Sequence, residues 1–572
     1  MKKLLNDPSK VVREMLEGIA RLTPHAAILG DENVLVRRGL PTPSERPVAI
    51  ISGGGSGHEP AHGGYVGAGM LSAAVCGEVF TSPPTDAVLE AIRATSGPNG
   101  ALLIVKNYTG DRLNFGLAAE LARAEGIPVE IVTVADDVSL RAQSQRNQRR
   151  GIAGTVLVHK IAGAMAARGV PLAQVAATAR EACANLGTMG VALDGCTLPG
   201  ADKAGFRLAD NEIELGLGIH GEKGVERTAP MPADQLTETL LSNIIEDLAI
   251  KSGERVVLLV NGLGATPDME LAVVLRAAFN NLTRRNVTVE RAWCGTLLSA
   301  LNMPGCSISV LRVDDERLAL LDSETESRSW PGGGKVNQSI RMRIAVTSNL
   351  TSEPNSTVTH ENDAGWAQRL KPALDAVAHA LIANEAILTD LDSKAGDGDL
   401  GASMKRAADA IVAVPTNALT TPSGALATLG TALRRAIAGS SGPFYATALV
   451  RASRSLANAA EPTAQDWAAA FRSAADAISE LGGAKAGDRT MLDALVPAIE
   501  AFDGGLKGGL NAAEAWAAAV SAAESGAQDT AHMSPRAGRA SYLGARALGS
   551  PDGGAVAIAC WLRALQPHIT SR

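Results

Sequence analysis

At 572 residues the chain is too long for a single hydrophobic core, so its length predicts several domains. Hydrophobic residues make up 46% of it and charged residues 20%, which is a globular balance and excludes intrinsic disorder. The net charge of −7, without a basic cluster, argues against a nucleic-acid partner, and no apolar run reaches the ~18 residues of a membrane span.

The first residues, 1–8, include two lysines but not the apolar stretch of a signal peptide. The six cysteines of the chain are scattered and form no C-x-x-C pair, which argues against a zinc ribbon or a disulfide framework. We therefore expect a cytoplasmic protein with free thiols.

From about residue 10 to 330, strand-like runs of Val, Ile and Leu alternate with helical patterns. The strands are expected at 47–51, 101–105, 129–134 and 255–260, and helices at 86–94 and 116–126. Such alternation predicts an α/β fold with a largely parallel sheet. A Gly-rich junction near 185–225 marks the expected boundary between sub-domains of about 1–185 and 186–330.

The segment 51–65, which follows the first strand, allows three interpretations. As a dinucleotide fingerprint it fails, because the third glycine of the G-x-G-x-x-G spacing is missing. As a zinc-hydrolase motif, His58-Glu-Pro-Ala-His62 matches H-E-x-x-H, but the flanking glycines and the internal proline disfavour the helix that this motif requires. In the third interpretation the segment presents backbone N–H groups and a histidine to a small polar ligand.

Two further stretches favour the third interpretation over a plain tight turn. Lys106 and Asp111 follow the next strand, so both should lie along the same edge of the sheet. His220 is surrounded by glycines, which predicts an accessible position on a loop. We therefore expect His58, Asp111 and His220 to supply acid/base and nucleophilic groups.

Residues 331–365 are rich in Gly, Asn, Ser and Thr, which predicts a linker between domains 1–330 and 366–572. Its Gly-Lys pair lacks the frame of a Walker A loop. Beyond it, nearly every segment is rich in Ala and Leu at helical spacing, so we expect an all-α bundle. The helices are expected at 366–391, 424–438, 444–458, 464–481, 488–503, 512–525 and 553–565.

An acidic loop follows the first of these helices. Asp392, Asp397 and Asp399 are separated by glycines that allow the loop to fold back on itself. Converging carboxylates repel one another unless a cation holds them, and ligand sets made only of oxygen suit Mg²⁺ or Ca²⁺. The EF-hand spacing is absent. Gly-rich turns at 439–442, 482–491 and 550–554 could hold phosphates at helix N-termini, so the whole half indicates Mg²⁺-dependent phosphoryl transfer.

At this point the sequence resembles the single-chain, ATP-dependent dihydroxyacetone kinase family over nearly its whole length. The resemblance rests on motifs in the family's order. They are Gly53-Gly-Gly-Ser-Gly-His-Glu-Pro60, Asn107-Tyr-Thr-Gly-Asp111 with Asn114-Phe115, Arg149-Arg-Gly-Ile-Ala-Gly154, Gly216-Leu-Gly-Ile-His-Gly221, Leu301-Asn-Met-Pro-Gly305, Gly396-Asp-Gly-Asp399 and Gly538-Arg-Ala-Ser-Tyr-Leu-Gly544. The chain departs from the family in two places: Asp552-Gly-Gly554 replaces Asp-Pro-Gly, and Lys223 replaces a proline.

The resemblance implies a role for each matching residue. His220 would form a covalent hemiaminal with the carbonyl carbon of the substrate, and His58 and Asp111 would be acid/base residues. The ketose would contact Gly55, Ser56, Gly57, His58, Lys106 and Asp111. Asp392, Asp397 and Asp399 would hold two Mg²⁺ ions. The ATP contacts would be Leu400, Gly401, Ala402, Ser403, Ser440, Ser441, Gly482, Thr490, Met491, Asp552, Gly553 and Gly554.

The implied protein is a homodimer through its α/β half, with an eight-helix antiparallel barrel as its ATP domain. The implied reaction is phosphorylation of a short ketose, most simply dihydroxyacetone. Three alternatives stay open: a tetrulose kinase acting on erythrulose, a lyase forming cyclic flavin phosphate from flavin dinucleotide with Mn²⁺, and a non-catalytic carbonyl-binding regulator. The intact aspartate trio argues against the regulator, because a pure binder needs no Mg·ATP ligands.

Overall fold

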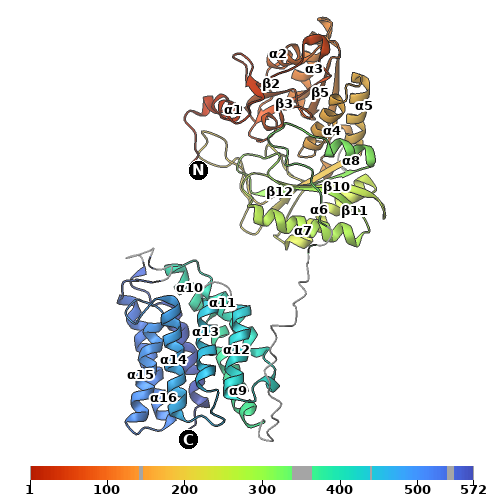
Figure 1. Ribbon diagram of the computed structural model, residues 1–572. Coiled ribbons are helices and arrows are strands. Elements are labelled where there is room, and N and C mark those ends of the chain that lie inside the picture. The colour runs from red at the N-terminus through yellow and green to blue at the C-terminus, as the bar shows by residue number, and fades with distance from the viewer. Residues whose placement is uncertain are drawn as a thin grey trace. The chain divides into compact units, whose positions relative to one another are not determined.

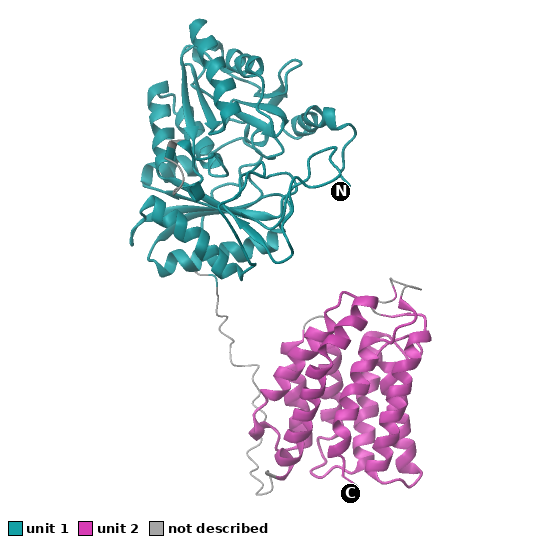
Figure 2. Cartoon of the chain, turned by 180° about the vertical axis from the view of Figure 1, so that it is seen from behind, with its two compact units in different colours: residues 1–344 teal, residues 345–572 magenta. Residues whose placement is uncertain are grey.

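The apolar strands of the first half build two separate sheets, whereas the described residues of the Ala-rich second half build only helices (Figure 1). The computed structural model describes residues 2–140, 146–337, 340, 364–437, 441–537, 541 and 547–570. The chain divides into two compact units, residues 1–344 and 345–572 (Figure 2). Most of the predicted linker, at 338–339 and 341–363, lies outside the described residues.

The first sheet of unit 1 has the strand order β1-β2-β4-β3-β5-β6. Its strands are β1 (Ala26–Ile28), β2 (Val34–Arg37), β3 (Ala49–Ser56), β4 (Ala73–Val79), β5 (Ala101–Lys106) and β6 (Val129–Val134). The four strands from β4 to β6 are parallel, as expected for strands linked through helices. Helices α2 (Thr85–Thr95) and α3 (Thr109–Ala124) cover one face, and α1 (Val11–Arg21) packs beside β1 and β4.

The second sheet has the order β11-β10-β12-β7-β8-β9. Its strands are β7 (Leu186–Ala192), β8 (Ile213–Leu215), β9 (Glu226–Thr228), β10 (Arg255–Gly262), β11 (Thr288–Gly295) and β12 (Gly305–Arg312). Only β10 and β11 are parallel, so the expectation of a largely parallel sheet is wrong here. The reason is that β12 returns through a short loop without a helix, which makes it antiparallel to β10.

One core joins the two sheets of unit 1. Helix α4 (Thr155–Ala167) is buried over nearly its whole length, and it packs with α5 (Leu172–Ala184) and α8 (Asp315–Asp322). The inward side chains of β5 and of β10 belong to the same apolar cluster as these helices. Helices α6 (Ala233–Leu248) and α7 (Asp268–Arg284) cover the opposite face of the second sheet. The segment after β3 is bonded to the loop between β11 and β12: Ser299 N–H donates to the carbonyl of His58 at 3.1 Å, and Leu301 N–H donates to that of Gly57 at 2.7 Å.

Unit 2 is a closed ring of helices. They are α9 (Ala364–Ala383), α10 (Glu385–Ala395), α11 (Leu400–Val412), α12 (Pro422–Ala436), α13 (Ser441–Ser455), α14 (Ala464–Gly482), α15 (Leu492–Lys507), α16 (Ala512–Asp529) and α17 (Gly553–Leu565). From α11 to α17 each helix packs against the next, and α9 packs against both α11 and α17, which closes a barrel. Short connections make neighbours antiparallel from α11 to α16, and α17 follows after residues 530–552; the N-termini of α11, α13, α15 and α17 share one end.

In the part of the chain that the structure describes, no helix is both long and apolar enough to cross a membrane.

Candidate active site

The glycine run expected as a loop is instead the second half of β3. The strand continues to Ser56 and pairs with β4 as far as Val79. A Cβ on Gly53 would lie 2.2 Å from the carbonyl oxygen of Val75, and one on Gly55 would lie 2.5 Å from the amide of Thr81. These two glycines therefore serve strand packing. The hydroxyl of Ser56 donates to the carbonyl of Gly77 at 2.7 Å, so its only proton is already used within the protein.

Gly54 faces the chemically active side of β3. Its missing side chain makes room for the amine of Lys106 and the carboxylate of Asp111, which would lie 2.6 Å and 3.4 Å from a Cβ there. Lys106 ends β5, and Asp111 occupies the first turn of α3, so the sheet edge predicted from the sequence brings both side chains together. Both are buried.

Lys106 has a further partner, His62. Its Nζ lies 2.7 Å from Nε2 of His62 and 3.3 Å from the carbonyl oxygen of Gly53. Burial lowers the pKa of Lys106, and the neighbouring Asp111 opposes this effect. His62 was singled out only as part of H-E-x-x-H. Residues 58–62 form bends and turns, and the two histidines have different partners, so the helical zinc motif is not formed.

His58 lies two residues after the end of β3 and is fully buried. Its Nδ1–H donates to the carbonyl oxygen of Ser299 at 2.8 Å, because a carbonyl can only accept. Its ring stacks on Phe80 at 5.1 Å between centroids. Burial, followed by the nearby His220 and Lys106, holds the pKa of His58 well below its ordinary value. His58 is therefore a neutral imidazole with its Nε2 free to accept a proton.

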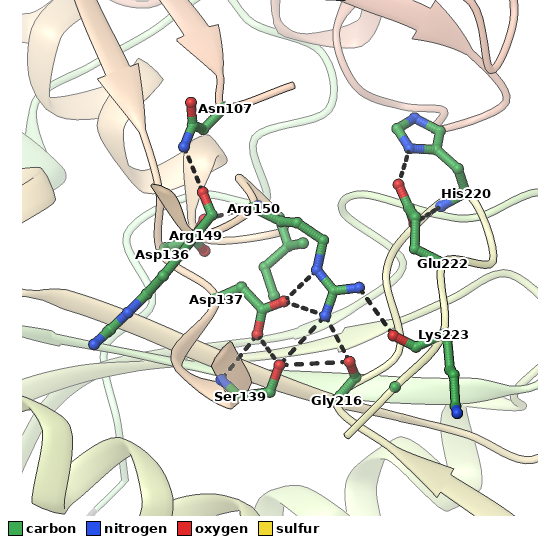
Figure 3. Close-up of polar contacts among 12 residues, drawn as sticks. Asn107, Asp136, Asp137, Ser139, Arg149, Arg150, Gly216, His220, Glu222 and Lys223 are labelled. Carbon is green, nitrogen blue, oxygen red and sulfur yellow. Dashed lines mark hydrogen bonds and ion pairs between the residues drawn. The ribbon is translucent and has the colours of Figure 1, made fainter. Parts of the chain in front are cut away.

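His220 meets His58 from the loop between β8 and β9. The two Nε2 atoms lie 3.0 Å apart, and the proton between them comes from His220, since His58 already donates through Nδ1. On its other side His220 Nδ1–H donates to Oε1 of Glu222 at 2.8 Å (Figure 3). The rings of Phe80 and Tyr108 meet the His220 ring edge-on, at 5.1 Å and 4.7 Å. The imidazole is thus confined by three rings and one carboxylate.

From the sequence alone, no role in this site was assigned to four of its residues: His62, which was considered only as a zinc ligand, Phe80, Tyr108 and Glu222. Glu222 could have been predicted, because it lies two residues after His220 in the sequence and a carboxylate often orients a catalytic histidine. Phe80 lies far from the other motifs, and nothing in the sequence brings it to His58. The predicted roles of Gly55, Ser56 and Gly57 in substrate binding stay predictions.

In unit 2 the acidic loop converges as expected. One carboxylate oxygen from each of Asp392, Asp397 and Asp399 lies within 4.8 Å of the others. Asp392 also fixes the loop, because its Oδ2 accepts from the backbone N–H of Asp399 at 2.9 Å. This oxygen-only donor set fits Mg²⁺ by its chemistry. We find no other such cluster in the described residues.

The predicted nucleotide contacts gather at the same end of the barrel. A Cβ on Gly553 would lie 2.7 Å from the side chain of Leu400, and one on Gly554 would lie 3.5 Å from Met491, so the first turns of α11 and α17 meet beside the turn before α15. Asp552 caps α17 by accepting from Ala555, and burial raises its pKa to about 6.

Two of the predicted contacts have packing roles. Gly401 would place a Cβ 2.0 Å from the hydroxyl of Thr389, and Gly482 would place one 2.8 Å from the ring of Phe444. Ser403 is buried and accepts from Arg406. Ser441 begins α13, whereas Ser440 lies outside the described residues.

The turn before α15 is held by a buried arginine that the sequence did not reveal. Arg489 is 1% exposed and donates to the carbonyls of Thr530, Ala547 and Ser550. Asp493 accepts from the backbone N–H of Thr490 at 2.7 Å. Thr490 and Met491 therefore occupy a fixed turn that faces the start of α17.

The two halves match two different family models. The Dak1 domain model matches residues 17–329, and the DAK2 domain model matches residues 394–567. The chain thus joins, in one polypeptide, the two domains of a two-domain kinase.

Curated relatives match along the whole chain. A putative 3,4-dihydroxy-2-butanone kinase of Solanum lycopersicum is 43% identical, over 98% of this chain and 97% of the relative. The triokinase/FMN cyclase of Mus musculus is 41% identical, over 99% of this chain and 98% of the relative. The D-erythrulose kinase of Mycolicibacterium smegmatis is 35% identical, over 100% of this chain and 99% of the relative.

A solved structure has the same two-part architecture. The dihydroxyacetone kinase from C. freundii in complex with AMP-PNP and Mg²⁺ is 35% identical, with a TM-score of 0.62 and coverage of 99% of both chains. The chain belongs to the dihydroxyacetone kinase family, and it is a kinase. Its α/β unit followed by an all-helical unit agrees with the fold expected from the sequence.

Proposed function

We propose that the protein transfers the terminal phosphoryl group of ATP to a primary hydroxyl of a short ketose, most simply dihydroxyacetone. The observation that carries the proposal is the 3.0 Å approach of the His58 and His220 Nε2 atoms in a ring-lined site. A neutral base next to a histidine suits covalent capture of a carbonyl group.

The ketose would be bound covalently by addition of Nε2 of His220 to its carbonyl group. Both ring nitrogens of His220 donate in the arrangement described, so the ring starts with a proton on each nitrogen. His58 takes the Nε2 proton, and the freed Nε2 of the now neutral His220 ring forms a bond to the carbonyl carbon. The π electrons of the C=O bond move to the oxygen, which then receives the proton back from His58. Formation of the bond returns the positive charge to the His220 ring, where Glu222 stabilises it. Glycerol has no carbonyl group, so it cannot be held in this way.

We assign Asp111 as the base for the hydroxyl that accepts the phosphoryl group. It is buried beside Lys106, and a carboxylate in this position can remove a proton as the new bond forms. Asp392, Asp397 and Asp399 would hold two Mg²⁺ ions, which neutralise phosphate charge when bound. The backbone N–H groups at the starts of α11, α13, α15 and α17 would contact the phosphates of ATP.

The test is ADP release with a panel of acceptors. We expect turnover with dihydroxyacetone or erythrulose and none with glycerol, and robust glycerol phosphorylation would overturn the hemiaminal role of His220. His220→Ala should abolish ketose affinity while Mg·ATP affinity persists. If ketose affinity survives in this variant, His220 has only a structural role.

A second activity is supported by one comparison, because the mammalian relative is named as an FMN cyclase as well as a triokinase. Incubation with flavin dinucleotide and Mn²⁺ would test it, with cyclic flavin phosphate as the product.

We also propose a homodimer through unit 1, following the family resemblance. A mass of one chain measured by light scattering would contradict this proposal.

A further inference from the structure

The motif Arg149-Arg-Gly-Ile-Ala-Gly154 has no part in the proposed chemistry, yet Arg150 reaches the loop that carries His220. Arg150 lies between β6 and α4, and its carbonyl accepts from the backbone N–H of Asp137, which pairs with Thr188 of β7; His220 lies between β8 and β9. Its Nη2 donates to the carbonyl oxygen of Gly216 at 2.7 Å, and its Nη1 lies 3.5 Å from the carbonyl oxygen of Lys223 (Figure 3). One guanidinium thus spans both ends of the loop.

The guanidinium is itself fixed by a buried carboxylate. Nε and Nη2 of Arg150 lie 2.8 Å and 2.7 Å from Oδ2 of Asp137. The hydroxyl and the backbone N–H of Ser139 donate to the other carboxylate oxygen. The Asp137 side chain is 1% exposed and that of Arg150 is 11% exposed. Such a buried, fully hydrogen-bonded pair is rigid, and removal of either partner leaves an uncompensated charge.

Besides Arg150, the loop has contacts of its own. The backbone N–H groups of Gly218 and His220 donate to the carbonyl and to Oε2 of Glu222, each at 3.0 Å, and the side chains of Leu217 and Ile219 are buried. Gly216 and Gly221 adopt positive φ angles, and the segment between β8 and β9 contains no helix or strand. A Cβ on Gly218 would lie 2.8 Å from Nη1 of Arg150 and 2.1 Å from Oε2 of Glu222, so the loop backbone passes directly between the arginine and the carboxylate that orients His220.

We propose that Arg150, held by Asp137, is the positioning residue that sets the place of His220 and Glu222 relative to His58. This inference rests on the proposed function. A nucleophile must be aligned with its base and with the carbonyl carbon, and a shift of about 1 Å can cost on the order of 10²-fold in rate. Loss of this contact should therefore weaken ketose capture and leave nucleotide binding in unit 2 unchanged.

The chain offers a matched control in the adjacent residue. Arg149 pairs with Asp247 at 2.8 Å, and the two side chains are 9% and 8% exposed, but no described contact joins the Arg149 side chain to the loop at 216–223. Arg150→Lys and Arg149→Lys each replace a forked guanidinium by a single amine in a buried ion pair. The two variants should lose similar thermal stability, so only a positioning role separates their kinetics.

The experiment compares the full-length protein with both variants. For Arg150→Lys we expect the KM for dihydroxyacetone to rise about tenfold or more and the KM for Mg·ATP to stay within about twofold. For Arg149→Lys we expect both constants to stay within about twofold. An unchanged ketose KM in Arg150→Lys, or an equal rise in both variants, would overturn the inference.

A second measurement needs no turnover. Carbethoxylation of His220 by diethyl pyrocarbonate, followed by mass spectrometry, reports how firmly the ring is held between Phe80 and Tyr108. We expect severalfold faster modification in Arg150→Lys than in the wild type, and no change in Arg149→Lys. If the wild type does not phosphorylate ketoses, the proposed function fails. Equal modification rates in all three proteins would refute the positioning role by itself.

Discussion

At the scale of single residues, burial decides the chemistry of the site. His58, His62 and His159 are fully buried, and their pKa values lie below the ordinary value, first because of desolvation. A histidine that stays neutral at physiological pH can accept a proton, which is the role we assign to His58. Motifs could single out His58, Asp111 and His220 as candidates, but they could not give the burial and orientation of the two histidines. These depend on Phe80, Tyr108 and Ser299 from distant segments.

The same burial predicts acid sensitivity. Burial, and next Lys106, lowers the pKa of His159 to about 3. Below pH ~6.5 the unfolded chain binds a proton that the folded chain does not, so the free energy of unfolding decreases as the pH falls. His159 should contribute up to about 1.4 kcal/mol per pH unit between its two pKa values.

His159→Gln tests this prediction, because glutamine can place an amide near the Nε2 that bonds to Ser52. In urea unfolding between pH 7 and pH 5, the variant should lose less stability than the wild type. An identical pH dependence in both proteins would mean that His159 does not remain neutral in the fold.

At the scale of elements, several helices and strands differ from those predicted by the local sequence pattern, because tertiary contacts override that pattern. The helix expected at 553–565 is found as α17, whereas the one expected at 366–391 is divided at Asn384 into α9 and α10. Helix α11 was not expected, since its Asp- and Gly-rich start hides the apolar period. Strand β3 was expected to stop before its glycines, because glycine has a low strand propensity. Pairing with β4 and β5 overrides that propensity.

We predict that alanine affects turnover and stability differently at Gly54 of β3 and at Gly116 of α3. Gly54→Ala would place a methyl group 2.6 Å from Nζ of Lys106 at a φ of +147°, so we expect loss of ketose turnover together with lower stability. Gly116→Ala is the matched control on α3, where a Cβ meets nothing within 4 Å. It should leave turnover unchanged and stabilise the fold by up to about 1 kcal/mol. Equal activity in the two variants would contradict this account of β3.

At the scale of the whole molecule, the proposed function divides the binding of ketose and of Mg·ATP between the two units. Unit 1 contains the histidine pair, and unit 2 contains the aspartate trio, each built within its own fold. The division into an α/β half and an all-α half could be predicted from the change in composition and in the spacing of apolar residues. The presence of two sheets in unit 1 could not, because apolar runs do not reveal which strands pair or in which direction.

This division predicts that metal and ketose binding are separable. Asp399→Asn removes one negative charge from the three aspartates. The apparent dissociation constant for Mg²⁺ should therefore rise about tenfold or more, while the affinity for the ketose stays unchanged. Mg²⁺ should also raise the melting temperature of the wild type more than that of the variant. Asp409→Asn, in an exposed pair with Lys405 on the same helix, is the control and should resemble the wild type. A variant with normal Mg²⁺ dependence would contradict the assignment.

The central claim is that His220 captures a ketose covalently. A crystal structure of the protein with dihydroxyacetone and without nucleotide tests it most directly. We expect electron density that is continuous from Nε2 of His220 to the carbonyl carbon, with that carbon tetrahedral and His58 within hydrogen-bonding distance of the new hydroxyl. A planar, unbonded ketose beside His220, or a ketose bound elsewhere, would contradict the claim.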